Sequence, residues 1–228
     1  MNLAGKLFVV TGGNGALGQA VAATLTGYGA RLALIDHAHA EGPAPPGGLH
    51  YGGIDLADEQ MAHSVMARIA KDAGRLDGLV NVAGGFRWQK LADGSLDTWD
   101  VMYRLNLRTA VAASQAAIPY LPQTGGRIVN VAAMGAVKAA AGMGAYAASK
   151  AGVMRLTESL AEELKDRGIT VNAVMPSTLD TQKNRLDMPK ADFSRWVTPV
   201  EVAEVIAFLV SDAARAVTGA LIPVAGRV

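Results

Sequence analysis

The sequence predicts a doubly wound α/β fold, in which helices cover both faces of a single parallel sheet of about seven strands. Short, nearly continuous apolar runs alternate with longer helical patterns along all 228 residues, as expected for strands that are buried on both faces. A glycine-rich turn connects the first apolar run to the first helical pattern. Because crossovers between parallel strands are right-handed, this alternation places helices on both faces. We expect one domain over residues 1–228.

The expected strands are runs of Val, Ile, Leu and Ala that are too short to be helices. The first run reads Leu-Phe-Val-Val-Thr, and the third, which contains two glycines, is the weakest. The helical patterns between them are longer and carry polar residues at intervals. We expect strands at 7–11, 31–35, 50–54, 76–82, 127–132, 169–174 and 220–224, and helices at 16–28, 58–73, 96–119, 146–167 and 199–211.

Two segments interrupt the alternation of strands and helices. Residues 41–48 are so rich in Pro and Gly that we expect a loop there in place of a helix. Residues 177–197 are polar but contain Met188, Phe193 and Trp196. This mixture favours a mobile flap with an apolar inner side over a disordered linker.

The composition excludes several classes of function. With a net charge of +1, the chain has no basic field for nucleic acid and no polybasic patch for a membrane surface. It contains no cysteine, so we expect neither disulfides nor a metal site. The N-terminal residues lead directly into the first strand, unlike a secretory signal, and no apolar run is long enough to span a membrane. We expect a cytoplasmic protein that acts on a small molecule.

Residues 11–18, Thr-Gly-Gly-Asn-Gly-Ala-Leu-Gly, lie between the first strand and the first helix. Glycines permit a tight turn that brings the backbone close to a pyrophosphate, and the helix N-terminus supplies N–H donors and a positive dipole end. A glycine cluster alone is most often a simple turn, but after a buried N-terminal strand it indicates a Rossmann-type dinucleotide site. Its expected cofactor-binding residues are Gly12, Asn14, Gly15, Ala16, Leu17 and Gly18.

The end of the second strand favours NAD(H) over NADP(H). An acidic residue at this position, here Asp36, bonds the adenosine ribose hydroxyls and repels a 2′-phosphate. Neither the glycine-rich turn nor the residues just after Asp36 include the Lys or Arg that would compensate such a repulsion. His37 and His39 have no third ligand nearby in the sequence, so we interpret them as loop residues near the adenosine.

Tyr146 and Lys150 are four residues apart in a helical pattern, which places them on one face, one turn from each other. An ammonium group beside a phenol favours the phenolate, so we expect Lys150 to lower the pKa of Tyr146 from about 10 toward neutrality. Such a tyrosine can exchange a proton with a substrate. The spacing alone is weak evidence, because Tyr and Lys at this distance are usually ordinary surface residues.

These motifs resemble, in order and over nearly the whole chain, those of the short-chain dehydrogenase/reductase family. The glycine-rich turn is similar to that family's T-G-x-x-x-G-x-G motif, and Tyr146 and Lys150 match its catalytic pair. The resemblance implies that Asn106 completes the catalytic set by holding a helix distortion and a water molecule that returns the proton. It also implies cofactor contacts at Asp55, Leu56, Asn81, Ala83, Gly84, Tyr146, Lys150, Pro176, Thr178 and Thr181.

Three positions depart from the family's pattern. Ala16 and Ser177 each stand where a glycine is usual. Ala133 takes the place of a serine that, in the family, hydrogen-bonds the substrate oxygen. Losing a polar donor at a reacting centre typically removes about 3 kcal/mol of transition-state stabilisation. The resemblance thus implies an unusual substrate.

Ala133 and residues 178–196 resemble the dihydropteridine reductase branch of the family, which uses NADH and also has Ala at the serine position. That resemblance implies a substrate such as a quinonoid dihydropterin. Phe86 either stacks on a flat substrate ring or packs in the ordinary way. Asn106, in contrast, resembles the wider family and favours a general carbonyl or 3-hydroxyacyl dehydrogenase. The expected substrate-side residues are Ala133, Gly85, Phe86, Met188 and Trp196.

A non-catalytic NAD-binding module is the alternative from another class of protein, and only Ala133 supports it. Tyr146, Lys150 and Asn106 together argue against it, because binding alone requires only Lys150 of the three. The helices expected at 96–119 and 146–167 are rich in Ala, and the resemblance implies that they pair subunits into a homodimer or homotetramer. We therefore predict an NADH-dependent oxidoreductase in which Tyr146 donates a proton while NADH supplies hydride.

Overall fold

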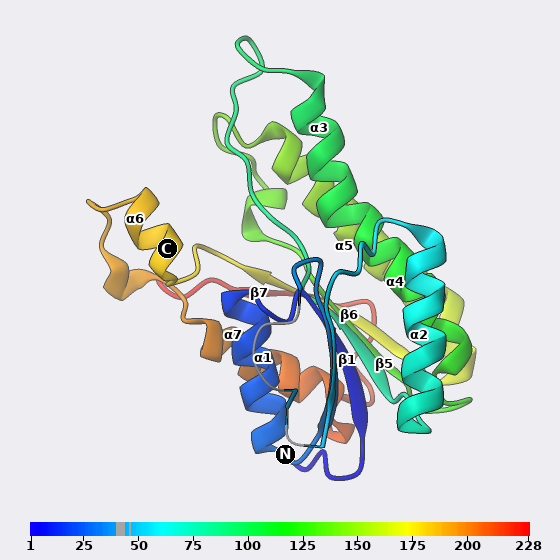
Figure 1. The fold of residues 1–228 in the computed structure, drawn as a ribbon. Coiled ribbons are helices and arrows are strands. Elements are labelled where there is room, and N and C mark those ends of the chain that lie inside the picture. Colours follow the sequence, from blue (N-terminus) through cyan, green and yellow to red (C-terminus); the bar gives the residue numbers. More distant parts are fainter. Residues whose placement is uncertain (40–43, 46) are drawn as a thin grey trace.

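The computed structural model describes residues 1–39, 44–45 and 47–228 and shows seven strands in one parallel sheet (Figure 1). The strand order is β3-β2-β1-β4-β5-β6-β7, so the chain builds outward from β1 in one direction and then in the other. The predicted doubly wound sheet is thereby confirmed. The order reverses between β1 and β4, which is where ligands bind in open sheets of this kind.

The observed strands lie where the apolar runs predicted them, with shifted ends. The third strand is short and ends at Tyr51, before the two glycines that make the predicted run 50–54 weak. The sixth strand is longer than predicted and continues to Pro176. The strands are β1 (Leu7–Thr11), β2 (Arg31–Ile35), β3 (Leu49–Tyr51), β4 (Gly78–Asn81), β5 (Arg127–Val131), β6 (Thr170–Pro176) and β7 (Leu221–Val224).

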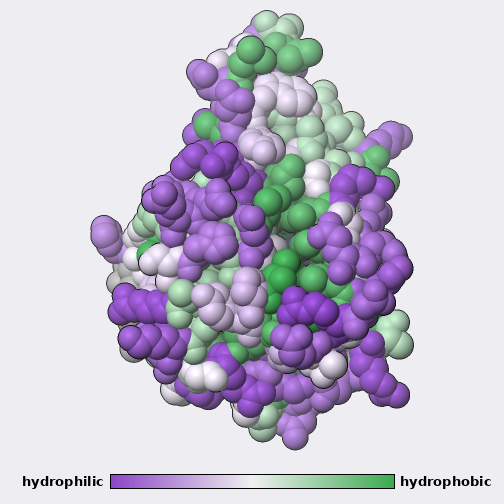
Figure 2. All heavy atoms as spheres, turned by 90° about the vertical axis from the view of Figure 1, so that its right-hand side faces the viewer, coloured by the Kyte–Doolittle hydropathy of each residue, from purple (hydrophilic) through white to green (hydrophobic). Residues whose placement is uncertain are grey.

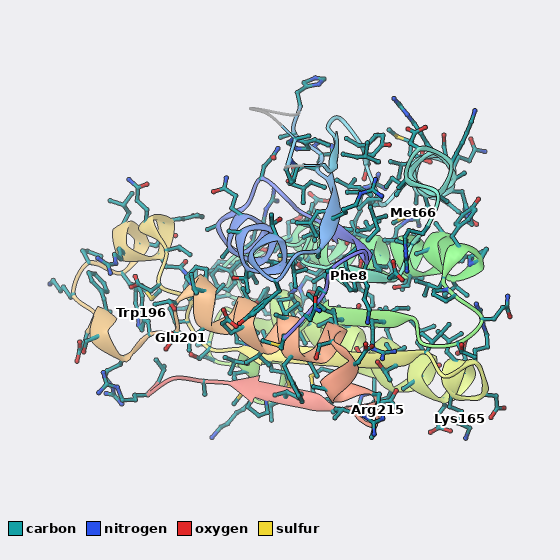
Figure 3. The ribbon with its side chains drawn as sticks, turned by 90° about the horizontal axis from the view of Figure 1, so that it is seen from below. Phe8, Met66, Lys165, Trp196, Glu201 and Arg215 are labelled. Carbon is teal, nitrogen blue, oxygen red and sulfur yellow. The ribbon has the colours of Figure 1, made fainter. Side chains whose placement is uncertain are left out.

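Helices cover the sheet on both faces. On one face α1 (Ala16–Gly27) and α7 (Pro199–Val210) enclose a core with the side chain of Phe8. On the other, α2 (Glu59–Ala73), α4 (Thr109–Ala117) and α5 (Gly144–Leu164) enclose a second core that includes Met66. Figure 3 shows Phe8 in the middle of the molecule and Met66 on α2. Within the described part of the chain, no helix is long and apolar enough to cross a membrane.

The helix predicted at 96–119 is present as one continuous helical segment, but it is not a regular α-helix throughout. The structure has α3 (Leu96–Met102), a π-helical turn over Tyr103–Arg108, then α4, and finally a 3₁₀ turn over Ile118–Tyr120. The last turn contains Pro119, whose missing N–H cannot continue an α-helix. The π-helical turn contains the buried Asn106, and π-turns of this kind frequently occur at functional sites.

Residues 177–197, called the flap below, are folded and held to the body of the protein. They contain α6 (Gln182–Asp187) and a 3₁₀ turn over Phe193–Arg195. Asp180 N donates to Val197 O at 2.7 Å, which closes the base of the flap. Arg227 fastens its far side, because its guanidinium donates to Ser194 O at 2.6 Å. Of the loop predicted at 41–48, residues 41–43 and 46 lie outside the described part.

Candidate active site

A cleft of about 700 Å³ lies where the strand order reverses, along the carboxyl ends of the central strands. The structure brings together most of the residues that the sequence predicted for cofactor and substrate. Those lining the cleft are Gly12, Asn14, Gly15, Ala16, Leu17, Gly18, Asp36, Asp55, Leu56, Ala83, Gly84, Gly85, Phe86, Ala133, Tyr146, Lys150, Pro176 and Thr181.

The glycine-rich turn is packed too tightly for side chains at Gly12, Gly13 and Gly18. Gly12 has a positive φ of 67°, and a Cβ there would lie 2.9 Å from the backbone of Ala83. A Cβ on Gly18 would lie 2.1 Å from Gly12 O. Gly15, the N-cap of α1, supplies no side-chain cap, and the first turn of α1 has no acidic residue. The amino end of α1 therefore offers free N–H donors to an anion.

Asp36 closes the cleft at the end of β2 and fixes the glycine-rich turn. Its carboxylate accepts hydrogen bonds from Asn14 N at 2.9 Å and from Ala38 N at 3.0 Å. Each carboxylate oxygen retains a further acceptor site for a ribose hydroxyl. Among the described residues that line the cleft, the only Lys or Arg side chains are Lys150 and Lys183, and Lys150 belongs to the tyrosine pair. This arrangement fits a dinucleotide without a 2′-phosphate.

Asp55 lies beside the same part of the cleft and is paired with Arg104. Arg104 Nη2 donates to Asp55 Oδ2 at 2.6 Å, and Ala57 N donates to Asp55 Oδ1 at 2.9 Å. Burial raises the pKa of Asp55, but these two hydrogen bonds and the charge of Arg104 outweigh it, so the pKa lies below its usual value. Asp55 is therefore a fixed carboxylate at neutral pH.

Tyr146 and Lys150 lie on α5 and both line the cleft. The predicted lowering of the pKa of Tyr146 is wrong for this structure, because burial raises it to about 12. Burial also lowers the pKa of Lys150 to about 8, which weakens the cation that was expected to favour the phenolate. Lys150 Nζ donates to Val131 O at 2.7 Å. Tyr146 is thus a protonated phenol over the whole physiological range and suits the role of an acid.

Asn106 lies behind the wall of the cleft and does not line it. Its Oδ1 accepts from Gly85 N at 2.8 Å, and its Nδ2 donates to Gly85 O at 3.1 Å. The same Nδ2 donates to Ser149 Oγ at 3.0 Å, and Ser149 Oγ donates to Tyr146 O at 2.7 Å. Asn106 therefore joins the loop after β4 to the turn of α5 that carries Tyr146. The predicted helix distortion is present as the π-helical turn.

Ser149 is a positioning residue that the sequence reasoning missed. It is buried and lies between Tyr146 and Lys150 in the chain. Its only signal in the sequence was that position, since a buried hydroxyl on a helix most often bonds its own backbone. The structure shows that it bonds both its own helix and the amide of Asn106.

Asn81 and Thr178, predicted to contact the cofactor, do not line the cleft. Asn81 is buried under it, where its Nδ2 donates to Asn130 Oδ1 at 2.9 Å and to Ser114 Oγ at 3.0 Å. Its side chain therefore ties β4 to β5 and to α4. The backbone of Thr178 accepts from Val197 N at 3.2 Å and closes the base of the flap.

The substrate side of the cleft is apolar around Tyr146. Ala133 is buried and places a methyl group, with no hydrogen-bond donor, at the position where the family has serine. The ring of Phe86 contacts the ring of Tyr146 edge to face, with centroids 5.0 Å apart, and half of Phe86 is exposed. Phe86 therefore packs on Tyr146 while its exposed part lines the cleft, an arrangement that fits both interpretations of this residue.

The flap presents one apolar side chain to the cleft, Leu179, and not the residues that were predicted to do so. Met188 and Trp196 do not line the cleft. Trp196 packs on Phe193 with ring centroids 4.8 Å apart, and the guanidinium of Arg185 lies 5.0 Å from the Phe193 ring. Figure 3 shows Trp196 at the edge of the molecule, within the flap. The aromatic residues stabilise the flap itself because they contact one another.

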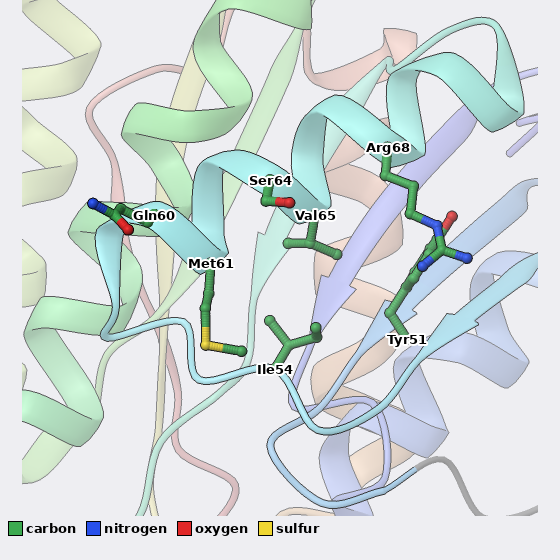
Figure 4. A pocket seen from close by; sticks show the side chains of 7 residues that line it. All are labelled: Tyr51, Ile54, Gln60, Met61, Ser64, Val65 and Arg68. Atoms are coloured by element: carbon green, nitrogen blue, oxygen red, sulfur yellow. The ribbon is translucent and has the colours of Figure 1, made fainter.

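A second pocket lies outside the cleft, between β3 and α2 (Figure 4). Its floor is apolar, with Ile54 shared between the two pockets, and Arg68 lies over the ring of Tyr51 at 5.0 Å. None of the predicted site residues lines it. No cluster of three potential metal ligands occurs among the described residues.

Comparisons with known proteins agree with this geometry. A family model described as "Enoyl-(Acyl carrier protein) reductase" matches residues 13–226. The chain is 31% identical to the 3-oxoacyl-acyl-carrier-protein reductase FabG of Thermotoga maritima over 99% of this chain and 98% of that protein. It superposes on a short-chain type dehydrogenase/reductase from Mycobacterium ulcerans with a TM-score of 0.89, at 25% identity over 99% of this chain and 90% of the other. It superposes on carveol dehydrogenase from Mycobacterium avium in complex with NAD with a TM-score of 0.86, at 27% identity over 99% and 98% of the two chains.

Proposed function

The chain belongs to the short-chain dehydrogenase/reductase family of oxidoreductases, and from this premise we propose that it uses NAD(H) to reduce a small molecule. One observation carries the proposal. Tyr146 and Lys150 line the same cleft as the glycine-rich turn and Asp36. A proton donor and a dinucleotide cradle in one cleft are the two parts that a nicotinamide-dependent reductase needs.

The residues of the cleft fit the cofactor. Gly12 and Gly18 leave room for a backbone approach that a Cβ would block, and the bare amino end of α1 binds the pyrophosphate. Asp36 accepts hydrogen bonds from the adenosine ribose. Lys150, 2.7 Å from Val131 O, holds its ammonium group next to the reacting region and binds the nicotinamide ribose. The bound dinucleotide supplies the hydride.

Tyr146 supplies the proton in this proposal. Its hydroxyl lies in a buried environment that raises its pKa to about 12, so the proton is present at neutral pH and is transferred to the substrate as hydride arrives. The phenolate that forms is stabilised by the ammonium group of Lys150, which lines the same cleft. Asn106 and Ser149 position Tyr146 through the hydrogen bond from Ser149 to Tyr146 O.

The cofactor preference is tested by thermal unfolding with each dinucleotide. We expect NADH to raise Tm more than NADPH does, because the carboxylate of Asp36 repels a 2′-phosphate. In Asp36→Asn the difference is expected to shrink or to reverse, since the charge is lost while an acceptor remains. Asp166→Asn, an exposed position beyond α5, is the control and is expected to keep the wild-type preference. A larger Tm rise with NADPH in the wild-type protein contradicts the NAD(H) assignment.

The substrate class follows from the single hydroxyl donor at the reacting centre. With a methyl group at Ala133, Tyr146 alone supports a developing oxyanion, which favours an activated carbonyl over a plain ketone. The match to a 3-oxoacyl-acyl-carrier-protein reductase supports such a carbonyl substrate. A quinonoid dihydropterin is the second candidate. Ala133 and the sequence of the flap support it, although none of the proteins named above is a dihydropteridine reductase.

Restoring a hydroxyl at position 133 tests this assignment. Ala133→Ser is expected to raise kcat/KM for plain ketones about 10- to 100-fold, because a second donor then reaches the substrate oxygen. NADH oxidation is measured with a plain ketone, a 3-oxoacyl thioester, a diketone and a quinonoid dihydropterin. The exposed Ala139→Ser, on the same segment, is the control. Unchanged ketone turnover in Ala133→Ser contradicts the role given to the methyl group, and fastest wild-type turnover of the pterin selects the second candidate.

We also propose that the protein is a homodimer or homotetramer that pairs through the helices around α4 and α5. Apolar side chains gather in a band along the middle of the face that carries α2 (Figure 2). Exposed apolar residues of the α3–α4 region include Trp99, Tyr103, Leu105 and Val111. A mass of one chain, 23.6 kDa, in light scattering would contradict this proposal.

A further inference from the structure

Lys183, on α6 of the flap, lines the same cleft as the amino end of α1. Of the described residues that line the cleft, it is the only Lys or Arg other than Lys150. Lys150 is buried and bonded to Val131 O, so it belongs to the reacting end. Lys183 is therefore the one basic side chain of the flap among the described residues that line the cleft.

The glycine-rich turn and the amino end of α1 carry too little positive charge to balance a pyrophosphate. The amino end of α1 contributes roughly half a positive charge, whereas the pyrophosphate of a dinucleotide carries two negative charges. No basic side chain of the glycine-rich turn completes the balance, since residues 11–18 contain neither Lys nor Arg. A cation from another segment that lines the cleft would complete it, and Lys183 is such a cation.

The present partner of Lys183 holds it only weakly. Lys183 Nζ lies 2.9 Å from Asp187 Oδ2, one turn along α6, and their side chains are 79% and 55% exposed. Exposed pairs of this kind contribute little to stability. The ammonium group can exchange Asp187 for a phosphate oxygen because its flexible four-carbon stem reorients freely.

The rest of α6 is fixed, so Lys183 projects from an ordered base. Arg185 forms a two-bond pair with Asp180, at 2.5 and 2.7 Å, and is not free for a ligand. The side chain of Thr181 caps α6 by accepting from Asn184 N, and Asn184 Nδ2 donates to Leu179 O at 2.8 Å. Movement of Lys183 toward a phosphate is therefore transmitted to the whole flap.

We propose that Lys183 binds the pyrophosphate of the dinucleotide and thereby couples cofactor binding to the position of the flap. This inference rests on the proposed function. It assigns to the flap a role in holding the cofactor, whereas its aromatic residues serve only the flap's own packing. Cofactor binding then adds a further tie between the folded flap and the glycine-rich turn, which is expected to slow the local opening of the flap.

Calorimetry with ADP and adenosine isolates the phosphate contact, because only ADP carries the diphosphate. In Lys183→Met the Kd for ADP and for NADH is expected to rise about tenfold, and the Kd for adenosine is expected to stay unchanged. Lys190→Met is the matched control, because Lys190 is an exposed lysine of the same flap that does not line the cleft. Asp187→Asn frees Lys183 and is expected to bind ADP at least as tightly as the wild-type protein.

Hydrogen exchange of residues 180–195 provides the readout for the flap. ADP is expected to slow exchange there in the wild-type protein and in Lys190→Met, but not in Lys183→Met. Equal ADP affinity and equal flap protection in Lys183→Met and wild type overturn the proposal. Equal weakening of ADP and adenosine also overturns it, since Lys183 would then act through the fold of the flap. A wild-type protein that binds no NADH contradicts the proposed function itself.

Discussion

Tyr146→Phe is expected to lower kcat about 1,000-fold while the Kd for NADH changes less than about twofold. The hydroxyl is the proton donor, and neither Ala132 nor Ala133, which line the same cleft, can take over this role. The ring remains, so the edge-to-face contact with Phe86 at 5.0 Å is kept and the fold is undisturbed. Single-turnover kinetics and calorimetry separate the two effects.

The pH dependence of the wild-type enzyme provides a second readout of the same pair. Lys150, whose pKa burial lowers to about 8, is charged below that pH and neutral above it. Its charge stabilises the phenolate of Tyr146, so reduction is expected to slow as the pH rises through about 8. Tyr120→Phe, at an exposed tyrosine that does not line the cleft, is the control for Tyr146→Phe and is expected to keep wild-type turnover. Full turnover in Tyr146→Phe would refute the role of the hydroxyl.

Gly18→Ala is expected to weaken NADH binding by at least about 100-fold. The added Cβ would lie 2.1 Å from Gly12 O and 2.9 Å from Gly12 C. The turn must therefore move away from α1, and the N–H donors at the amino end of the helix lose their alignment with the pyrophosphate. Calorimetry with NADH measures the loss of binding, and chemical unfolding measures the accompanying loss of stability.

The control is Gly27→Ala at the other end of the same helix, where a Cβ would meet nothing within 4 Å. This variant is expected to bind NADH normally and to be about 0.5–1 kcal/mol more stable, because alanine loses less backbone entropy in a helix. Normal NADH affinity in Gly18→Ala would show that the close packing of Gly18 on Gly12 is not needed for the cradle.

The sheet and the cradle could be predicted because their determinants are local. A buried strand such as Leu7–Thr11 is identified by its own residues, and the turn after it is identified by glycines whose missing side chains the structure requires. The spacing of Tyr146 and Lys150 likewise depends only on the geometry of one helix. These features needed no knowledge of how distant segments meet.

The π-helical turn and the packing of the flap depend on contacts between segments that are distant in the sequence. Asn106 leaves a regular helix because its amide bonds Gly85 and Ser149, which come from two other segments. Trp196 packs on Phe193 instead of entering the cleft. The composition of the flap alone does not determine which way its aromatic side chains point. The raised pKa of Tyr146 has the same origin, since burial is a property of the assembled molecule.

The buried amides Asn81 and Asn130 stand opposite each other in the parallel ladder of β4 and β5. If β5 slipped by one residue, each amide would face an apolar partner, and each buried group left without a hydrogen bond would destabilise the sheet by about 1–3 kcal/mol. The pair thus favours a single register of β4 against β5. This register fixes where the loops that follow the two strands, with Gly84 and Ala133, reach the cleft.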